Sequence, residues 1–378
     1  MITDRSTTQA AHAAHAAAAV FARRLSARRA TAQERAARSA DASFGTAFTE
    51  HMVTLRWTRE EGWHDGRVEP YAPLALDPAT VGLHYGQAVF EGLKAYRTAD
   101  GRTAVFRPHA HAERFRRSAA RLLMPELPEE TFVRAVEELV TADEAWVPGD
   151  THRSLYLRPL MFASETGLAL RPAQEFRFLL IAFVTEGFFG APRPITVWVS
   201  EDHTRAAPGG TGAAKYAGNY AASYAAQAQA AEHGCDQVVW LDARERRWVE
   251  ELGGMNVFFV EQDGPDRKLV TPPLTGTILP GVTRDSLLRA APGLGLEVEE
   301  RRIGVDEWRE GCRRGRISEV FACGTAAQVT SVGAVRTARD EFTVGDGRPG
   351  PVAGMLSDLL SGIERGLAPD PQKWMHYV

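Results

Sequence analysis

The sequence predicts a mixed α/β protein with two domains. At 378 residues the chain is too long for one ordinary hydrophobic core. Short apolar runs typical of strands alternate with longer amphipathic runs typical of helices from Phe44 onward. The Gly-Ala-Pro-Arg-Pro segment at 190–194 interrupts this rhythm. We therefore expect a first domain at 44–189, a linker or lid at 190–202 and a second domain at 203–378.

Composition excludes several classes of protein. Hydrophobic residues make up 44% and charged residues 24% of the chain, which is ordinary for a soluble globular protein. The net charge of −4 gives no global basic field for nucleic acid or anionic lipid. No apolar run is long enough to span a bilayer. The three cysteines are too widely spaced for a disulfide framework or a Cys-x-x-Cys metal site, so we expect no metal and a cytoplasmic location.

Residues 1–43 differ from the rest of the chain. They are rich in alanine and arginine and carry no wide apolar stripe. We expect a flexible or partly helical arm without a catalytic role. A transit peptide is the alternative, because such peptides are rich in arginine and serine.

The first domain begins with an alternating strand and contains a nearly continuous apolar run near its end. The run at 176–184 predicts a strand that is buried on both faces. The strand at 154–162 places Tyr156 and Arg158 on the same face. In order, we expect strands at 51–57, 154–162 and 176–184, a turn at 60–66, a basic amphipathic helix at 109–123, and a helix that starts at Pro128.

The second domain repeats a rhythm of strands and helices. We expect strands at 195–200, 237–241, 248–251, 256–260 and 317–322, and helices at 217–233 and 283–291. Two turns of small residues, at 273–281 and 323–327, offer backbone amides. The first of them leads into a helix start, which suits an anion.

Lys215 lies in a glycine-rich stretch, Gly-Gly-Thr-Gly-Ala-Ala-Lys-Tyr-Ala-Gly-Asn-Tyr, at 209–220. Only four of the 44 basic residues are lysines. An ε-amine can form a Schiff base, whereas a guanidinium cannot. Glycines also allow a bulky partner to approach the backbone closely. A surface turn with an incidental lysine is the alternative interpretation.

A reactive lysine and two amide-rich turns together favour a ligand that carries both an aldehyde and a phosphate. Pyridoxal 5'-phosphate is such a ligand, and it also needs an acid at its ring nitrogen. Glu251 is the candidate, since it ends a strand before Gly-Gly in an otherwise apolar stretch. A solvated carboxylate beside Glu250 is the alternative.

Several motifs in order resemble the branched-chain aminotransferases, pyridoxal-phosphate enzymes of fold type IV. They are Phe-Glu-Gly-Leu-Lys-Ala-Tyr, Leu-Tyr-Leu-Arg-Pro, the stretch around Lys215, Glu-Glu-Leu-Gly-Gly-Met-Asn, Ile-Leu-Pro-Gly-Val-Thr-Arg and Phe-Ala-Cys-Gly-Thr-Ala. The resemblance covers about residue 44 to the C-terminus. It implies a small N-terminal α/β domain, a larger C-terminal domain with a pseudo-barrel, and a homodimer with active sites near its interface.

By this resemblance, Lys215 forms the Schiff base and transfers the proton during transamination. Glu251 pairs with the ring nitrogen, and Tyr220 donates to the ring oxygen. The phosphate is held by Arg114, by amides at Thr277 and Ile278, and by the turn at Gly324 and Thr325. A solvated helix arginine is the alternative interpretation of Arg114.

The resemblance also implies substrate contacts. The α-carboxylate lies on the amides of Ala326 and Ala327, and Tyr85 reaches over from the other subunit. Arg158 binds the side-chain carboxylate of glutamate or 2-oxoglutarate. The side-chain pocket is walled by Phe90, Tyr156, Phe188 and Gly254. A structural ion pair for Arg158 and core positions for Tyr85 and Phe90 are the alternatives.

The chain departs from relatives near the pocket. Phe188 stands where many relatives have a tyrosine, and Gly254 where some have a threonine. The reaction predicted is amino transfer between L-leucine, L-isoleucine or L-valine and 2-oxoglutarate. An aminotransferase for an unusual hydrophobic amino acid is the alternative. A lyase that releases pyruvate from aminodeoxychorismate, disfavoured by 218–220, and a non-enzymatic cofactor-binding protein are further alternatives.

Overall fold

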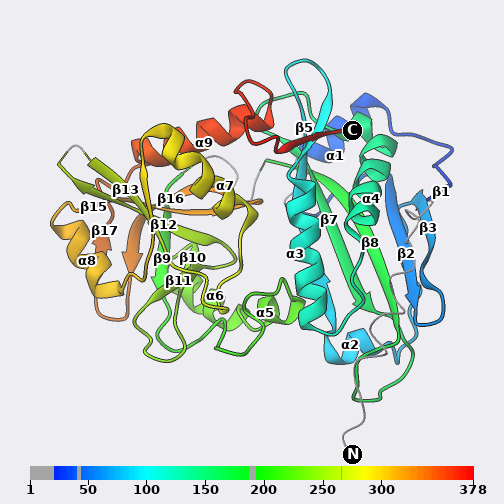
Figure 1. The fold of residues 1–378 in the computed structure, drawn as a ribbon, viewed down its shortest axis with the longest axis horizontal. Helices are drawn as coiled ribbons and strands as arrows, with labels where there is room; N and C mark the ends of the chain where they lie inside the picture. The colour runs from blue at the N-terminus through cyan, green and yellow to red at the C-terminus, as the bar shows by residue number, and fades with distance from the viewer. Residues whose placement is uncertain (1–20, 41–43, 187–192, 265) are drawn as a thin grey trace, which may run out of the picture.

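The computed structural model describes residues 21–40, 44–186, 193–264 and 266–378. Two nine-stranded sheets occupy separate halves of the molecule (Figure 1). Helices α3 and α4 belong to the first half, and α7, α8 and α9 to the second. The predicted mixed α/β class is confirmed, and none of the described helices combines the length and the hydropathy that a membrane-spanning segment requires.

The first sheet is antiparallel except at one edge. Its strand order is β1-β3-β2-β8-β7-β5-β6-β18, with β4 paired to β7 and only β1 and β3 parallel. The elements of this half are β1 (Ala22–Arg23), α1 (Ala32–Ala40), β2 (His51–Thr58), β3 (Gly62–Pro70), α2 (Val81–Tyr85), β4 (Ala88–Phe90), β5 (Leu93–Arg97), β6 (Thr103–Phe106), α3 (Pro108–Arg121), α4 (Glu129–Ala142), a 3-10 turn (Glu144–Trp146), β7 (Ser154–Ala163), β8 (Glu175–Thr185) and, from the chain end, β18 (Met375–Tyr377).

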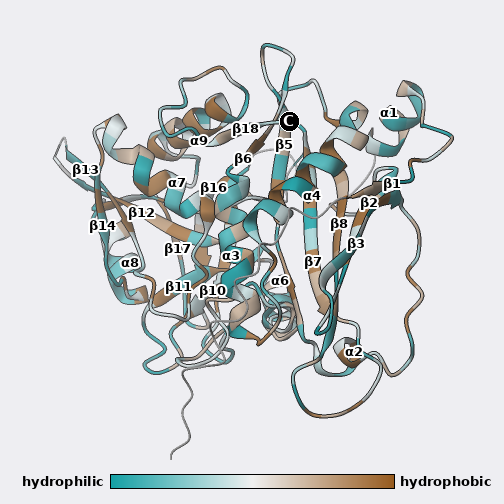
Figure 2. Cartoon of the chain, turned by 45° about the vertical axis from the view of Figure 1, so that its right-hand side comes forward, coloured by the Kyte–Doolittle hydropathy of each residue, from teal (hydrophilic) through white to brown (hydrophobic). Residues whose placement is uncertain are grey.

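Burial explains why this half folds as it does. Strand β8 lies between β2 and β7 and buries eight of its eleven residues, as its apolar run predicts. Helices α3 and α4 turn Phe115, Phe132 and Val136 inward against this sheet, and the three rings of Phe115, Phe132 and Phe178 contact one another. The central strands carry the hydrophobic residues (Figure 2). The first core therefore lies between β2, β7 and β8 and these two helices.

The second sheet is mixed and curls toward closure. Its order is β11-β10-β9-β16-β15-β12-β13-β14, with β17 paired to β16. A bridge between Leu252 and Met255 brings the edge strand β11 back beside β12, which lies five places along the sheet. Its elements are β9 (Ile195–Val199), α5 (Ala217–Ala221), α6 (Tyr224–Glu232), β10 (Gln237–Leu241), β11 (Val249–Leu252), β12 (Asn256–Asp263), β13 (Asp266–Thr271), α7 (Val282–Ala290), a 3-10 turn (Ala291–Leu294), β14 (Glu297–Glu300), α8 (Val305–Arg313), β15 (Ile317–Gly324), β16 (Gln328–Arg336), β17 (Glu341–Thr343) and α9 (Pro351–Glu364).

The two halves are joined through α3 and through the chain end. Arg107, which precedes α3, pairs with Asp285 of α7 at 2.6 Å, and its Nη1 donates to the Ser286 hydroxyl. After α9, the chain returns to the first sheet, where β18 pairs with β6. These contacts hold the first sheet and α7 together around the space between them.

The domain boundaries stay a prediction, but three segments differ from their expected roles. Residues 21–40 of the arm are attached to the first half, because β1 pairs with β3 and both Phe21 and Ala30 are buried in its core. Residues 195–199 form the strand expected there, β9, but it is an internal strand of the second sheet and not part of a linker. Residues 375–377 belong to the first sheet.

Two local expectations also need correction. The turn expected at 60–66 is shorter, since β3 already starts at Gly62 and pairs with β2. The helix expected at 217–233 is two helices, α5 and α6. The Ser223 hydroxyl donates to the carbonyl of Tyr220 at 2.6 Å between them, and such local side-chain bonds compete with the helix ladder.

Candidate active site

A cavity of about 310 Å³ lies between the two halves. It is lined from both sides, by strands β4, β7 and helix α3 of the first half and by the turns after β11 and β15 of the second. Cavities of this size with a few polar groups are typical of small-molecule sites. The predicted residues that line it are Phe90, Arg114, Tyr156, Arg158, Lys215, Tyr220, Gly254, Gly324, Thr325, Ala326 and Ala327.

Lys215 enters this cavity from a backbone that is fixed on both sides. Its amide donates to the Ser118 hydroxyl at 2.9 Å, and its carbonyl accepts from the Phe90 amide at 3.1 Å. Its Nζ lies 3.0 Å from the Tyr220 hydroxyl and 4.8 Å from the centre of the Phe90 ring. A half-buried primary amine is therefore held at a defined place between two aromatic side chains.

Glu251 lies one layer behind the cavity wall. It is 2% exposed and lines a smaller cavity that shares Tyr220, Gly254 and Leu279 with the main one. Burial raises its pKa to about 7, although Arg205 and the Leu279 amide oppose the shift. Arg205 Nε lies 2.7 Å from its Oε2, and the Leu279 amide donates to its Oε1 at 2.6 Å.

Arg114 is buried and its position is set by a second acid, Glu91. Arg114 Nε and Nη2 donate to the two carboxylate oxygens at 2.6 and 2.7 Å, the bidentate geometry that matches a guanidinium to a carboxylate. His111 Nδ1 lies 2.8 Å from the same carboxylate. The Arg114 guanidinium, helped by the hydrogen bond with His111, holds the pKa of Glu91 well below its usual range despite the opposing effect of burial. Arg114 Nη1 also donates to the carbonyl of Pro280.

Thr277 and Ile278 do not line the cavity, which differs from the expected anion contacts. Both are buried, and the Thr277 hydroxyl donates to Glu250 Oε1 at 2.5 Å instead of facing a ligand. The cavity is lined by the residues at the start of α7, 281–283. Together with Gly324 and Thr325, this helix start forms one polar end of the cavity.

Arg158 lies at a second polar position in the wall. Its guanidinium lies 4.9 Å from the Phe90 ring centre and 5.4 Å from that of Tyr156. Within the described ranges it forms no ion pair, and its buried Nε has no hydrogen-bond partner. Gly92 makes the arrangement possible, because a Cβ there would lie 1.8 Å from the Tyr156 hydroxyl. The structure thus leaves one guanidinium unsatisfied beside the cavity.

Of the remaining predicted substrate contacts, one does not line the cavity and one is not described. Tyr85 is 45% exposed, lies outside the cavity of its own chain, and donates to the carbonyl of Leu168 at 3.0 Å. Phe188 lies outside the described residues, as does most of the lid expected at 190–194. The sequence did not reveal Glu91, His111 or Arg205; Glu91 alone carried a signal, inside the Phe-Glu-Gly motif.

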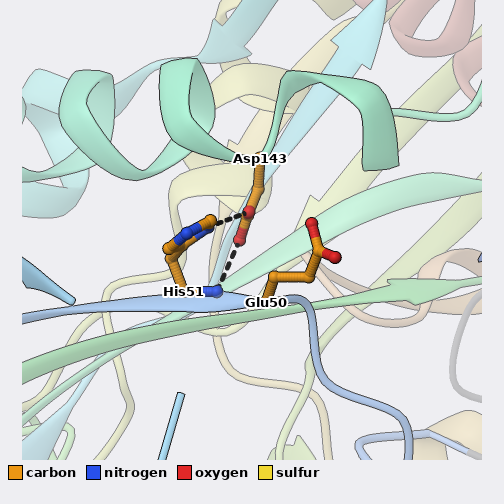
Figure 3. A group of neighbouring side chains, drawn as sticks. All are labelled: Glu50, His51 and Asp143. Carbon is orange, nitrogen blue, oxygen red and sulfur yellow. Dashed lines mark hydrogen bonds and ion pairs between the residues drawn. The ribbon is translucent and has the colours of Figure 1, made fainter. Parts of the chain in front are cut away.

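A separate group of acids and a histidine lies in the first half (Figure 3). His51 Nδ1 lies 2.6 Å from Asp143 Oδ1, and His51 Nε2 accepts from the Ser26 amide at 3.0 Å. Glu50 accepts from the Ala30 amide. Both ring nitrogens of His51 are therefore engaged, and the group fastens the 21–40 segment to β2 instead of offering free metal ligands.

Comparisons with known proteins agree with this geometry. The model of the family described as amino-transferase class IV matches residues 88–335. The chain is 55% identical to a branched-chain-amino-acid aminotransferase of Mycolicibacterium smegmatis, over 89% of this chain and 92% of that protein. It is also 55% identical to a probable branched-chain-amino-acid aminotransferase of Streptomyces coelicolor, over 91% and 94% of the two chains.

Solved structures give the same result. The branched-chain amino acid aminotransferase of Escherichia coli superposes with a TM-score of 0.71 at 30% identity, over 85% of this chain and 98% of that one. The branched-chain amino acid aminotransferase of Thermobaculum terrenum, solved in its PLP-bound holo form, superposes with a TM-score of 0.68 at 26% identity, over 85% and 97%. The cavity with its lysine, and these matches over most of the chain, show that this protein belongs to the class IV aminotransferases, among the branched-chain-amino-acid aminotransferases.

Proposed function

We propose that this chain is a pyridoxal-phosphate-dependent aminotransferase that exchanges an amino group between L-leucine, L-isoleucine or L-valine and 2-oxoglutarate. The observation that carries the proposal is the half-buried amine of Lys215 in a cavity that has a buried arginine in its wall and a buried acid behind it. When bound, the cofactor supplies an aldehyde for the amino group and a protonated ring that accepts electrons.

The residues present fit such a group. Arg114, Thr283 and Thr325 meet at the polar end of the cavity, where the start of α7 adds its amides, so this end suits the phosphate. Tyr220, next to Lys215, offers a hydroxyl to the ring oxygen. Glu251 is shielded from bulk water behind the cavity wall and would pair with the ring nitrogen.

Lys215 is the proton carrier in this proposal. The Nζ of Lys215, when it is not bonded to the cofactor, would be a base that could take the proton from the substrate Cα. The Tyr220 hydroxyl at 3.0 Å limits the positions of that amine. Arg205 keeps a positive charge 2.7 Å from Glu251 and so favours its ionised form, against the effect of burial.

Arg158 explains how one cavity accepts two kinds of substrate. Its unpaired guanidinium suits the second carboxylate of glutamate or 2-oxoglutarate. The rings of Phe90 and Tyr156 beside it suit an aliphatic side chain. The α-carboxylate then meets the turn at Ala326 and Ala327. An unusual hydrophobic substrate stays a second possibility that rests on Phe188, outside the described residues.

We further propose a homodimer in the cytoplasm. Leu83, Tyr85, Leu168 and Leu170 are 63%, 45%, 55% and 88% exposed, and the Tyr85 hydroxyl bonds the backbone of Leu168. Exposed apolar groups of this kind mark partner surfaces, and light scattering measures the state directly. Three unpaired cysteines suit a reducing compartment.

The half-reaction tests the proposal. L-Leucine added to the purified holoenzyme should convert the bound aldehyde to pyridoxamine phosphate, with loss of its visible absorption band and release of 4-methyl-2-oxopentanoate. The K215M variant should show no conversion, because it lacks the amine. Unchanged absorption in the wild-type protein, with cofactor bound, would reject the proposed reaction.

A further inference from the structure

Lys94 of β5 is a buried lysine that the chemistry above does not use. It is 3% exposed, and within the described chain its ammonium takes part in no ion pair. Burial lowers its pKa to about 8, Glu364 opposes that shift, and Arg365 adds to it. Isolated buried ammonium groups are costly, so their charge normally has a partner.

A small cavity lies between Lys94 and residues that also line the active site. It has a volume of about 20 Å³, enough for about one water molecule, and its wall includes Lys94, Tyr96, His111 and the acid Glu364. Its other wall contains Thr283, Gly324 and Thr325. Those three residues also line the main cavity, so a single layer of small side chains separates the two spaces.

The sheet register independently directs Lys94 toward this region. Lys94 lies directly opposite Tyr156 on the neighbouring strand β7, and residues paired in this way share one face of a sheet. Tyr156 lines the main cavity. Lys94 therefore belongs to the face that holds the site.

The charges at the polar end of the cavity indicate a role for Lys94. The charge of Arg114 is already matched by Glu91 through two short hydrogen bonds. A phosphate monoester carries about −1.5 to −2 charges at neutral pH. The polar end of the cavity therefore needs positive charge beyond the Arg114–Glu91 pair and the dipole of α7.

We propose that Lys94 is a positioning residue that supplies this second positive charge, acting on the cofactor phosphate through the small cavity behind Thr283, Gly324 and Thr325. This inference rests on the proposed function. Glu364 lines the same small cavity, and its charge opposes the lowering of the Lys94 pKa, while burial raises the pKa of Glu364 itself. The phosphate, in contrast, remains charged throughout the neutral range.

Cofactor binding with and without the phosphate tests this inference. Affinities of the apoprotein for pyridoxal 5'-phosphate and for pyridoxal are measured by equilibrium titration for the wild type, K94M and K94R. K268M is the matched control, since Lys268 is paired with Glu297 and Glu299 at 3.0 and 3.1 Å on the surface. Thermal melting with and without inorganic phosphate gives a second readout that needs no ring.

K94M should lose about tenfold or more in affinity for pyridoxal 5'-phosphate and stay within about twofold for pyridoxal. K94R should stay close to the wild type, and inorganic phosphate should raise the melting temperature of the wild type more than that of K94M. Equal losses of affinity for both ligands, or no loss for either, would overturn the inference. A residue that only packs the core would not distinguish a ligand with a phosphate from one without it. If K94M fails to fold, K94Q takes its place: a loss of affinity confined to pyridoxal 5'-phosphate supports the charge, and equal losses or none overturn it.

A separate experiment tests the proposed function itself. Borohydride reduction of the wild-type protein with pyridoxal 5'-phosphate should attach the cofactor to Lys215, as peptide mass spectrometry would show. No attachment there rejects the proposed function itself. Attachment with a normal ligand preference in K94M rejects only the role of Lys94.

Discussion

Replacing Glu91 by glutamine should destabilise the protein strongly, although Glu91 lies outside the main cavity lining. The carboxylate is fully buried and accepts from Arg114 Nε and Nη2 at 2.6 and 2.7 Å, from the Gly92 amide at 3.1 Å, and pairs with His111 at 2.8 Å. A glutamine would turn an NH₂ group toward these donors and leave the buried guanidinium without a counter-charge. Removing one member of a buried ion pair costs about 3–5 kcal/mol of the free energy of unfolding.

Urea unfolding of the cofactor-free protein, followed by tryptophan fluorescence and circular dichroism, measures this cost. E113Q is the matched control, because Glu113 pairs with Arg117 on the exposed side of α3, the helix that carries Arg114, and should change stability by less than about 0.5 kcal/mol. The double variant E91Q/R114M should recover part of the loss, since it removes both charges. A cost for E91Q below about 1 kcal/mol would refute the reasoning.

The pH dependence of this difference follows from the direction of the shift. The pKa of Glu91 in the folded protein is lowered by Arg114 and His111 against the effect of burial. A lowered pKa stabilises the fold above the unfolded-state pKa, about 4.3, and this stabilisation is lost as the pH falls toward the folded pKa. The difference between the wild type and E91Q should therefore be constant near pH 7 and shrink below about pH 4.

Two further predictions concern the acid behind the cavity and the unpaired arginine. Burial raises the pKa of Glu251 from 4.5 to about 7, so in the apoprotein this group should cost about 3 kcal/mol of stability as the pH rises from 4 to 8. In E251Q the free energy of unfolding should no longer fall with pH in this range, and an unchanged pH dependence would contradict the raised pKa. In the holoenzyme, E251Q should lower kcat by about 100-fold or more. R158M should raise KM for 2-oxoglutarate by about tenfold or more and leave the half-reaction with L-leucine within about threefold, whereas equal losses for both substrates would argue against a role in carboxylate binding.

The parts of the fold that the sequence predicted are those with local causes. The apolar run of β8 begins and ends within one residue of its expected position, and α4 starts directly after Pro128. Strand β18 has no such signal, because its three residues are a strand only through pairing with β6, far away in the chain. The 21–40 segment is similar, since its order depends on the contacts of Ser26 and Ala30 with His51 and Glu50.

In the site, too, the sequence predicted the residue types that carry the chemistry but not the contacts that position them. The glycine-rich surroundings and the residue type together pointed to Lys215, because an amine can form a Schiff base and a guanidinium cannot. In contrast, nothing in the sequence states that Glu91 neutralises Arg114, because that depends on β4 and α3 meeting in the fold. The segment from Pro273 to Gly281 offered many amides, but Thr277 and Ile278 are buried away from the cavity, and the Thr277 hydroxyl donates to Glu250. The start of α7, residues 281–283, lines the cavity instead. The polar end of the cavity therefore begins a few residues beyond the place that the sequence indicated.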